Sequence, residues 1–69
     1  MTTFSIARNI RAERVRCGLT QLEMARKLGL SATGYNHKEN GKRQFTLEEF
    51  VTICKILETD PETLIRKSR

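Results

Sequence analysis

The sequence predicts an all-helical domain of five helices, and three features of the chain support this. Helix-capping patterns recur along the chain, apolar residues return at intervals of three and four, and glycines fall where the periodic segments end. The pair Asn40-Gly41 could signal a hairpin turn, but its flanks lack alternating apolar residues. The expected helices cover about 5–16, 21–28, 32–40, 47–57 and 61–67.

The ends of these helices follow from local residue chemistry. Thr20-Gln-Leu-Glu23 and Thr46-Leu-Glu-Glu49 match the capping box, in which a threonine caps the N3 amide and the glutamate reaches back. Ser31 is a further candidate cap, and Asp60-Pro61 places a cap before a proline at the first helical position. The glycines expected to end helices in the left-handed conformation are Gly18, Gly29 and Gly41.

Apolar stripes on the predicted helices are expected to face one common core. In chain order their members are Ile6, Ile10 and Val15, then Met24, Ala25 and Leu28, then Leu47, Phe50, Val51, Cys54 and Leu57, and finally Leu64 and Ile65. Most of the bulky core is expected from three phenylalanines, Phe4, Phe45 and Phe50.

The length of 69 residues indicates a single domain spanning 1–69. A chain this short buries only about 60% of its unfolded surface, so a second subunit would help its marginal core. There is no apolar run of the roughly 18 residues that a membrane span needs and no signal-peptide layout, so we expect a cytoplasmic protein without a membrane partner. Cys17 and Cys54 belong to no cluster, which favours reduced cysteines and no metal site.

The charge favours a polyanionic partner. Thirteen Lys and Arg against eight Asp and Glu give a net charge of +5. A single histidine, with no nucleophile–base arrangement and no glycine-rich phosphate loop, leaves nothing to assemble an active site. We therefore expect a binding protein rather than an enzyme, with no cofactor and no small-molecule ligand.

The connection between the second and third predicted helices carries the functional prediction. Only Gly29-Leu30-Ser31 separates them, which forces a sharp crossing and indicates a helix-turn-helix unit. Tyr35 is expected to point its ring toward the core. The outer side of the third helix then presents small or polar side chains that suit base edges and thymine methyls in the major groove, namely Ala32, Thr33, Asn36, His37 and Asn40.

Four segments together resemble the Cro/phage-repressor (XRE-like) type of helix-turn-helix DNA-binding protein. They are Gly18-Leu-Thr-Gln21, Met24-Ala25, Leu28-Gly-Leu-Ser31 and Glu39-Asn-Gly-Lys-Arg43. The resemblance implies a lambda-repressor-like fold whose second and third helices dock on double-stranded DNA. It also implies a homodimer on a pseudo-palindromic operator.

The resemblance further implies roles for single residues. Glu39 lies where this family often places an acid paired with an arginine of the first helix, which Arg14 matches. Base edges would be read by Ala32, Thr33, Asn36 and His37, with a phosphate contact as the other option for Asn36. Phosphates would be contacted by Gln21, Asn40, Lys42 and Arg43.

Two residues depart from the family pattern. Lys38 stands where the family usually has a large apolar residue, and we expect its stem to lie along the core while its ammonium reaches a phosphate. Gly34 lies inside the recognition helix and costs about 1 kcal/mol of helix propensity relative to alanine. It either loosens this helix until DNA orders it or lets the backbone approach the groove closely.

The function that these features favour is a dimeric transcription repressor. The subunits are expected to meet through the fourth and fifth helices, where acids and basic tail residues such as Lys67 and Arg69 pair across a two-fold axis. A restriction-modification controller and the DNA-binding component of a toxin–antitoxin pair remain alternatives of the same class. A protein-interaction module that reuses this fold without reading DNA is the alternative from another class.

Overall fold

The computed structural model describes residues 3–66, and five helices account for most of them. They are α1 (Thr3–Arg16), α2 (Gln21–Leu28), α3 (Ala32–Glu39), α4 (Leu47–Ile56) and α5 (Pro61–Arg66). There is no strand among the described residues, so the predicted all-α, five-helix fold is confirmed. The largest difference in bounds is at α1, which begins at Thr3 rather than at about residue 5. The predicted end of the fifth helix at Lys67 lies outside the described residues.

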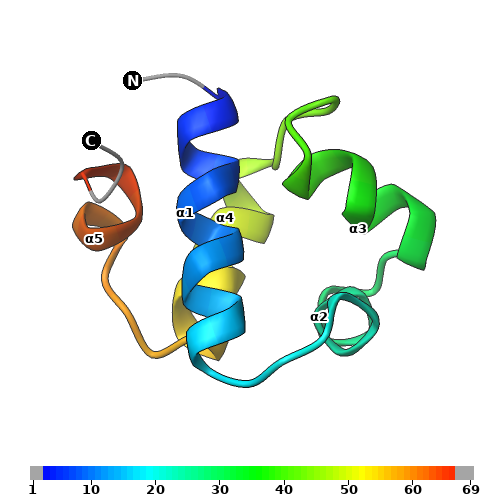
Figure 1. The fold of residues 1–69 in the computed structure, drawn as a ribbon, viewed down its shortest axis with the longest axis horizontal. Helices are drawn as coiled ribbons and strands as arrows, with labels where there is room; N and C mark the ends of the chain where they lie inside the picture. Colours follow the sequence, from blue (N-terminus) through cyan, green and yellow to red (C-terminus); the bar gives the residue numbers. More distant parts are fainter. Residues whose placement is uncertain (1–2, 67–69) are drawn as a thin grey trace.

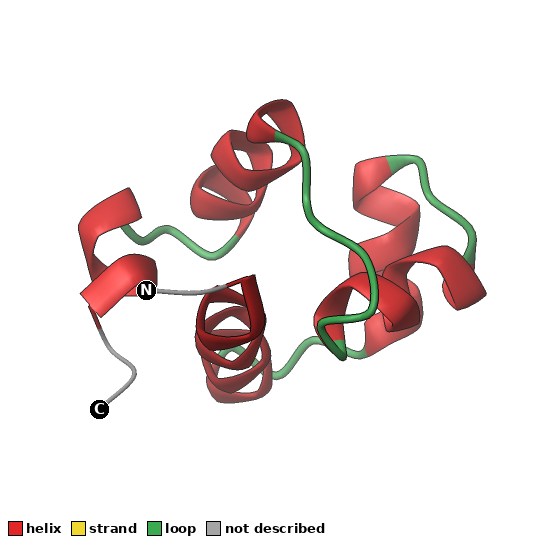
Figure 2. Ribbon diagram, turned by 90° about the horizontal axis from the view of Figure 1, so that it is seen from above, coloured by secondary structure: helices red, strands yellow, loops and turns green. Residues whose placement is uncertain are grey.

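The arrangement places α1 in the middle of the molecule. Figure 1 shows α4 behind it, α5 on one side and the α2–α3 pair on the other. The view from above separates the same groups, with α5 and the α2–α3 pair at opposite ends (Figure 2). The helix-turn-helix unit therefore forms one end of the fold, and its outer side is not covered by any other described helix.

Local capping explains where α2 and α4 begin. The hydroxyl oxygens of Thr20 and Thr46 accept the N–H of Glu23 and Glu49, and each glutamate accepts the N–H of its threonine in return. Both predicted capping boxes are thus present. Each satisfies two backbone donors that the first turn of a helix leaves without a partner.

The core lies where the five helices meet. It consists of buried residues from every helix, with Ile6, Leu28, Phe45 and Phe50 among the half-buried residues packed around it. The side chain of Phe4 lies outside the described part of the chain. The buried members are Ala7, Ile10, Met24, Ala25, Tyr35, Ile53, Cys54, Leu57 and Leu64.

Three of the predicted core residues are instead exposed. Val15, Leu47 and Val51 are 60%, 78% and 43% exposed. Val15 follows Ile10 by five residues, which turns it well away from the stripe, and the buried positions on that face are taken by Glu13 and Arg14. Leu47 is the first residue of α4 and lies beyond the edge of the core.

A polar contact joins the two ends of the chain. The side-chain amide of Asn9 in α1 is buried and donates a hydrogen bond to the backbone carbonyl of Leu64 in α5. This bond fixes the short α5 against α1, together with the buried side chain of Leu64.

No helix in the described residues is long and apolar enough to cross a membrane.

The sharp turn after α2 yields a prediction for stability. Gly29 has a φ of 71°, and a Cβ added there would meet no atom within 4 Å, so the cost of Gly29→Ala is purely conformational. We expect this variant to lower the free energy of unfolding by about 1–2 kcal/mol in urea denaturation. Gly29→Asn should lose less, because asparagine tolerates the left-handed region. Equal losses for the two variants would contradict this explanation.

Candidate nucleic-acid interface

The turn between α2 and α3 sets the position of α3. Gly29 ends α2 in the left-handed conformation, and the next amide, that of Leu30, donates to the carbonyl of Ala25 over 2.9 Å. Ser31 then caps α3, since its hydroxyl oxygen accepts the N–H of Gly34 at 3.0 Å. A Cβ on residue 34 would lie 3.0 Å from that same oxygen, so Gly34 leaves room for the cap.

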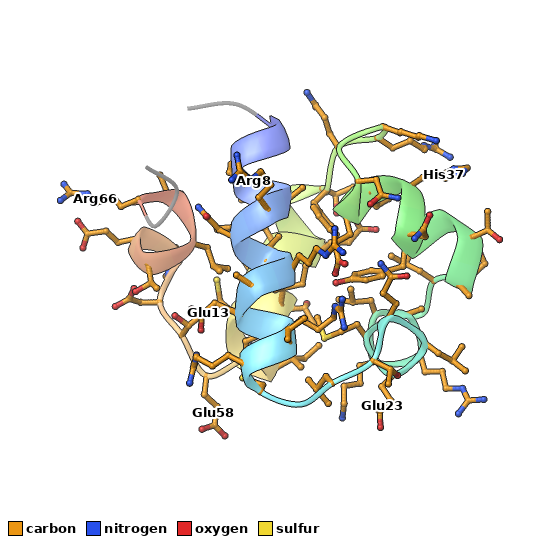
Figure 3. All side chains as sticks on the ribbon, viewed as in Figure 1. Arg8, Glu13, Glu23, His37, Glu58 and Arg66 are labelled. Atoms are coloured by element: carbon orange, nitrogen blue, oxygen red, sulfur yellow. The ribbon has the colours of Figure 1, made fainter. Side chains whose placement is uncertain are left out.

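The outer side of α3 is open to solvent. Ala32 and Thr33 are exposed at its start, His37 is half-buried, and Asn40 is exposed just past its end. Figure 3 shows His37 at the outer edge of the molecule, on the side away from α5 and Arg66. Of the predicted base-reading residues, Ala32 and Thr33 are thus the most accessible.

Two basic residues follow α3 in a fixed turn. The carbonyl of His37 accepts the backbone N–H groups of both Lys42 and Arg43, at 2.9 and 3.3 Å. Gly41 allows this reversal with a φ of 80°. The side chains of Lys42 and Arg43 are exposed, so two cations lie at the end of α3.

Beneath this surface, one buried carboxylate joins three helices. Arg14 of α1 forms a bidentate ion pair with Glu39, with Nε 2.8 Å from Oε2 and Nη2 3.1 Å from Oε1. The hydroxyl of Tyr35 donates to Oε2 at 2.5 Å, and Nε2 of Gln21 donates to Oε1 at 2.8 Å. The two oxygens of Glu39 thus accept four hydrogen bonds. Glu39 itself is only 2% exposed.

These partners keep Glu39 ionised. Burial alone would raise the pKa of the Glu39 carboxyl, but the hydrogen bonds from Arg14, Tyr35 and Gln21 outweigh it and hold the pKa below its usual value. Burial and the hydrogen bond to Glu39 raise the pKa of the Tyr35 hydroxyl, which therefore stays protonated and remains a donor.

Three of the predicted DNA-contacting side chains extend the hydrogen-bond network that begins at this carboxylate. Asn36 donates its Nδ2 to Oε1 of Gln21 at 3.0 Å, and Asn40 donates its Nδ2 to Oδ1 of Asn36 at 3.1 Å. Gln21 and Asn36 are half-buried. All three side chains were expected to contact DNA, and here each also takes part in intramolecular hydrogen bonds.

Lys38 was expected to contact a phosphate, but its side chain forms an ion pair inside the protein. Its ammonium is 2.6 Å from Oε1 of Glu49 in α4, and the two side chains are only 12% and 16% exposed. Burial alone would raise the pKa of Glu49, yet the bonds from Lys38 and Thr46 hold it below its usual value. Lys38 is therefore not part of the candidate DNA surface. The expected apolar placement of its stem explains why the ammonium can reach a partner inside the fold.

Sequence reasoning missed two members of this site. Glu49 was assigned only a capping role, and the Tyr35 hydroxyl was not paired with Glu39. Their i, i+4 spacing on α3 could have indicated the Tyr35–Glu39 contact, because residues four apart share one face of a helix. The pairing of Lys38 with Glu49 joins two helices and had no such signal.

Nothing among residues 3–66 suggests a metal centre. No group of three or more His, Cys, Asp or Glu side chains within that range could hold an ion. The surface presents instead a polar helix face with two cations beside it. That is the arrangement of a helix-turn-helix DNA-binding protein.

Comparison with protein families agrees with this class. A family model described as helix-turn-helix matches residues 10–64, so the chain belongs to this family, which is of the XRE (Cro/C1) type. The chain is thus a DNA-binding transcription regulator. A comparison of the sequence with curated proteins gave no match.

Solved structures share the fold. The restriction-modification controller protein C.AhdI from Aeromonas hydrophila has a TM-score of 0.80 and 24% identity, over 90% of this chain and 94% of that one. The clp gene regulator ClgR from Corynebacterium glutamicum has a TM-score of 0.91 and 18% identity, over 99% of this chain and 72% of that one. A second ClgR structure gives a TM-score of 0.88 at 18% identity, over 99% and 88% of the two chains. At these identities the likeness concerns the fold alone.

The buried ion pair yields a stability prediction. Glu39→Gln leaves the Arg14 guanidinium buried without its anion, and we expect a loss of about 3–5 kcal/mol in the free energy of unfolding. Glu62→Gln is the matched control, because its ion pair with Arg66 is 66% and 78% exposed and should cost under about 0.5 kcal/mol.

The same pair should respond to acid. The pKa of Glu39 is lowered in the folded state, so its contribution is fully present above the ordinary value of 4.5 and is lost as the pH falls through the lower folded value. The stability difference between wild type and Glu39→Gln should accordingly shrink below pH 4.5. A difference that stays constant down to the acid-unfolding limit would contradict the assignment.

Proposed function

We propose that this regulator is a homodimeric repressor that acts in the cytoplasm, without catalytic activity, on a pseudo-palindromic operator. The outer side of α3 enters the major groove, where Thr33 and His37 read base edges and Ala32 contacts a thymine methyl. Lys42, Arg43 and Asn40 contact phosphates next to the recognition helix. The observation that carries this proposal is the exposure of Ala32 and Thr33 on α3 together with two exposed cations, Lys42 and Arg43, just past the end of that helix.

The proposed subunit contact uses the first turn of α4 and part of α5. Leu47 is 78% exposed, and it borders a groove of about 360 Å³ lined by Ile6, Phe45, Phe50 and Ile65. An apolar knob and an apolar groove on one surface are self-complementary, as a two-fold contact requires. The charged tail residues Lys67 and Arg69, expected to pair across the axis, lie outside the described residues.

A two-fold dimer would suit the helical repeat of DNA. Two recognition helices related by the axis would meet successive major grooves if they lay about 34 Å apart, which is one turn of the duplex. A dimer also adds apolar burial to a chain whose own core is small.

A restriction-modification controller is the second candidate. The observation that favours it is the match to C.AhdI, a restriction-modification controller protein, over 94% of that chain. A methyltransferase gene beside the gene for this chain would favour the controller, and its absence would favour the simple repressor.

DNA binding can be tested with an operator selected from a random duplex library. We expect the selected duplex to bind about 10³-fold or more tightly than a random one near physiological salt. Thr33→Val and His37→Ala should reduce this ratio, whereas Lys42→Ala should weaken binding to both duplexes and reduce the salt slope by about 1. Equal binding of both duplexes by the wild type would refute the proposed repressor and favour a protein-interaction module.

The dimer surface can be tested separately by analytical ultracentrifugation. Leu47→Glu places a charge on the proposed apolar contact, and we expect the dimer dissociation constant to rise about tenfold or more. Val15→Glu is the matched control, because Val15 is also exposed, at 60%, but lies outside the groove. Dissociation by Val15→Glu and not by Leu47→Glu would place the interface elsewhere.

A further inference from the structure

We propose that the charge of Glu39 sets the direction of a chain of three side-chain amides, Gln21, Asn36 and Asn40. By doing so it fixes the pattern of donors and acceptors that this part of the molecule offers to DNA. Gln21 and Asn36 are then positioning residues, and Asn36 is not an independent base reader. The inference rests on the proposed function, since it concerns how the same surface discriminates between sequences.

The direction of the chain follows from what each group can donate. An ionised carboxylate only accepts, so Gln21 must turn its NH₂ toward Oε1 of Glu39, 2.8 Å away. Its carbonyl oxygen then faces Asn36, which must donate its own NH₂ at 3.0 Å. The oxygen of Asn36 in turn accepts from Nδ2 of Asn40 at 3.1 Å. One fixed charge thus determines three amide orientations.

The carboxylate itself cannot rotate to relax this order. Both guanidinium bonds from Arg14 and the hydroxyl of Tyr35 hold it in place, and the side chain of Glu39 has no measurable exposure. Hydrogen bonds to an ionised group are stronger than neutral ones, and a chain of such bonds strengthens each member. The order therefore extends from the buried pair to the exposed Asn40.

A fixed amide can discriminate where a rotating one cannot. A free asparagine turns its amide over and presents a donor or an acceptor with similar ease, so it fits either pattern of base edges. In the chain, Asn36 has used its oxygen and one N–H, and Asn40 has used one N–H. Asn40 therefore keeps its second N–H for a phosphate and its oxygen as the acceptor at the open end. Holding one pattern also reduces the entropy lost on binding.

A double-mutant cycle separates this role from independent contacts. The variants are Gln21→Met, which keeps the length of the side chain and leaves the Arg14–Glu39 pair intact, Asn36→Ala, and the two combined. The readout is the ratio of affinities for the selected operator and a random duplex, with thermal melting as the check on folding. Thr33→Ala in both backgrounds is the matched control, because Thr33 is exposed and lies outside the chain.

We expect Asn36→Ala to reduce the ratio about tenfold in the wild type and less than about twofold in the Gln21→Met background. Thr33→Ala should have the same effect in both backgrounds. Equal effects of Asn36→Ala in both would show that Asn36 reads DNA by itself and would overturn the inference. A Gln21→Met variant that melts earlier but keeps the full ratio would overturn it as well, since Gln21 would then be purely structural.

A second readout needs no DNA. In ¹⁵N-labelled protein, the side-chain amide protons of Asn36 should exchange slowly, and Gln21→Met should remove this protection. Protection that survives in Gln21→Met would overturn the inference even if the wild type failed to recognise an operator. Failure of the wild type to discriminate, with protection behaving as expected, would refute the proposed function alone.

Discussion

The position of the recognition helix depends on one buried carboxylate. Glu39 of α3 accepts hydrogen bonds from Arg14 of α1, from Gln21 of α2 and from Tyr35 of α3 itself. Apolar contacts between helices tolerate some sliding, whereas a buried charge is strongly destabilising unless its partners are in place. The carboxylate therefore makes the relative position of the three helices specific. It holds the helix-turn-helix unit, α2 and α3, in a fixed position against α1.

The sequence could predict the fold because the signals for it are local. Capping boxes, the Gly29 turn and apolar periodicity each depend on residues within one turn of a helix. The same local rules were wrong for Val15, Leu47 and Val51, which carry apolar side chains at positions outside the core. Apolar character alone does not distinguish a core residue from an exposed one.

The site could be predicted only in part, because the hydrogen-bond partners of polar side chains depend on how the helices pack together. The sequence could place Asn36 and Lys38 on α3 and could indicate that their groups need partners. It could not tell that Gln21, fifteen positions earlier, and Glu49, eleven positions later, lie within 3.0 and 2.6 Å. Such pairs depend on the crossing of helices, which periodicity does not encode.

The Lys38–Glu49 pair has a consequence for how the two proposed surfaces work together. It closes the loop between α3 and α4, because it joins the last turn of the recognition helix to the first turn of α4. Lys42 and Arg43 lie inside that loop, and Leu47 lies two residues before Glu49. A low-exposure ion pair at this point resists separation of the two helices, because opening it would leave two charges without partners. In a dimer that meets through Leu47, the distance between the two recognition helices would therefore be set by rigid elements, as binding to half-sites one helical turn apart requires.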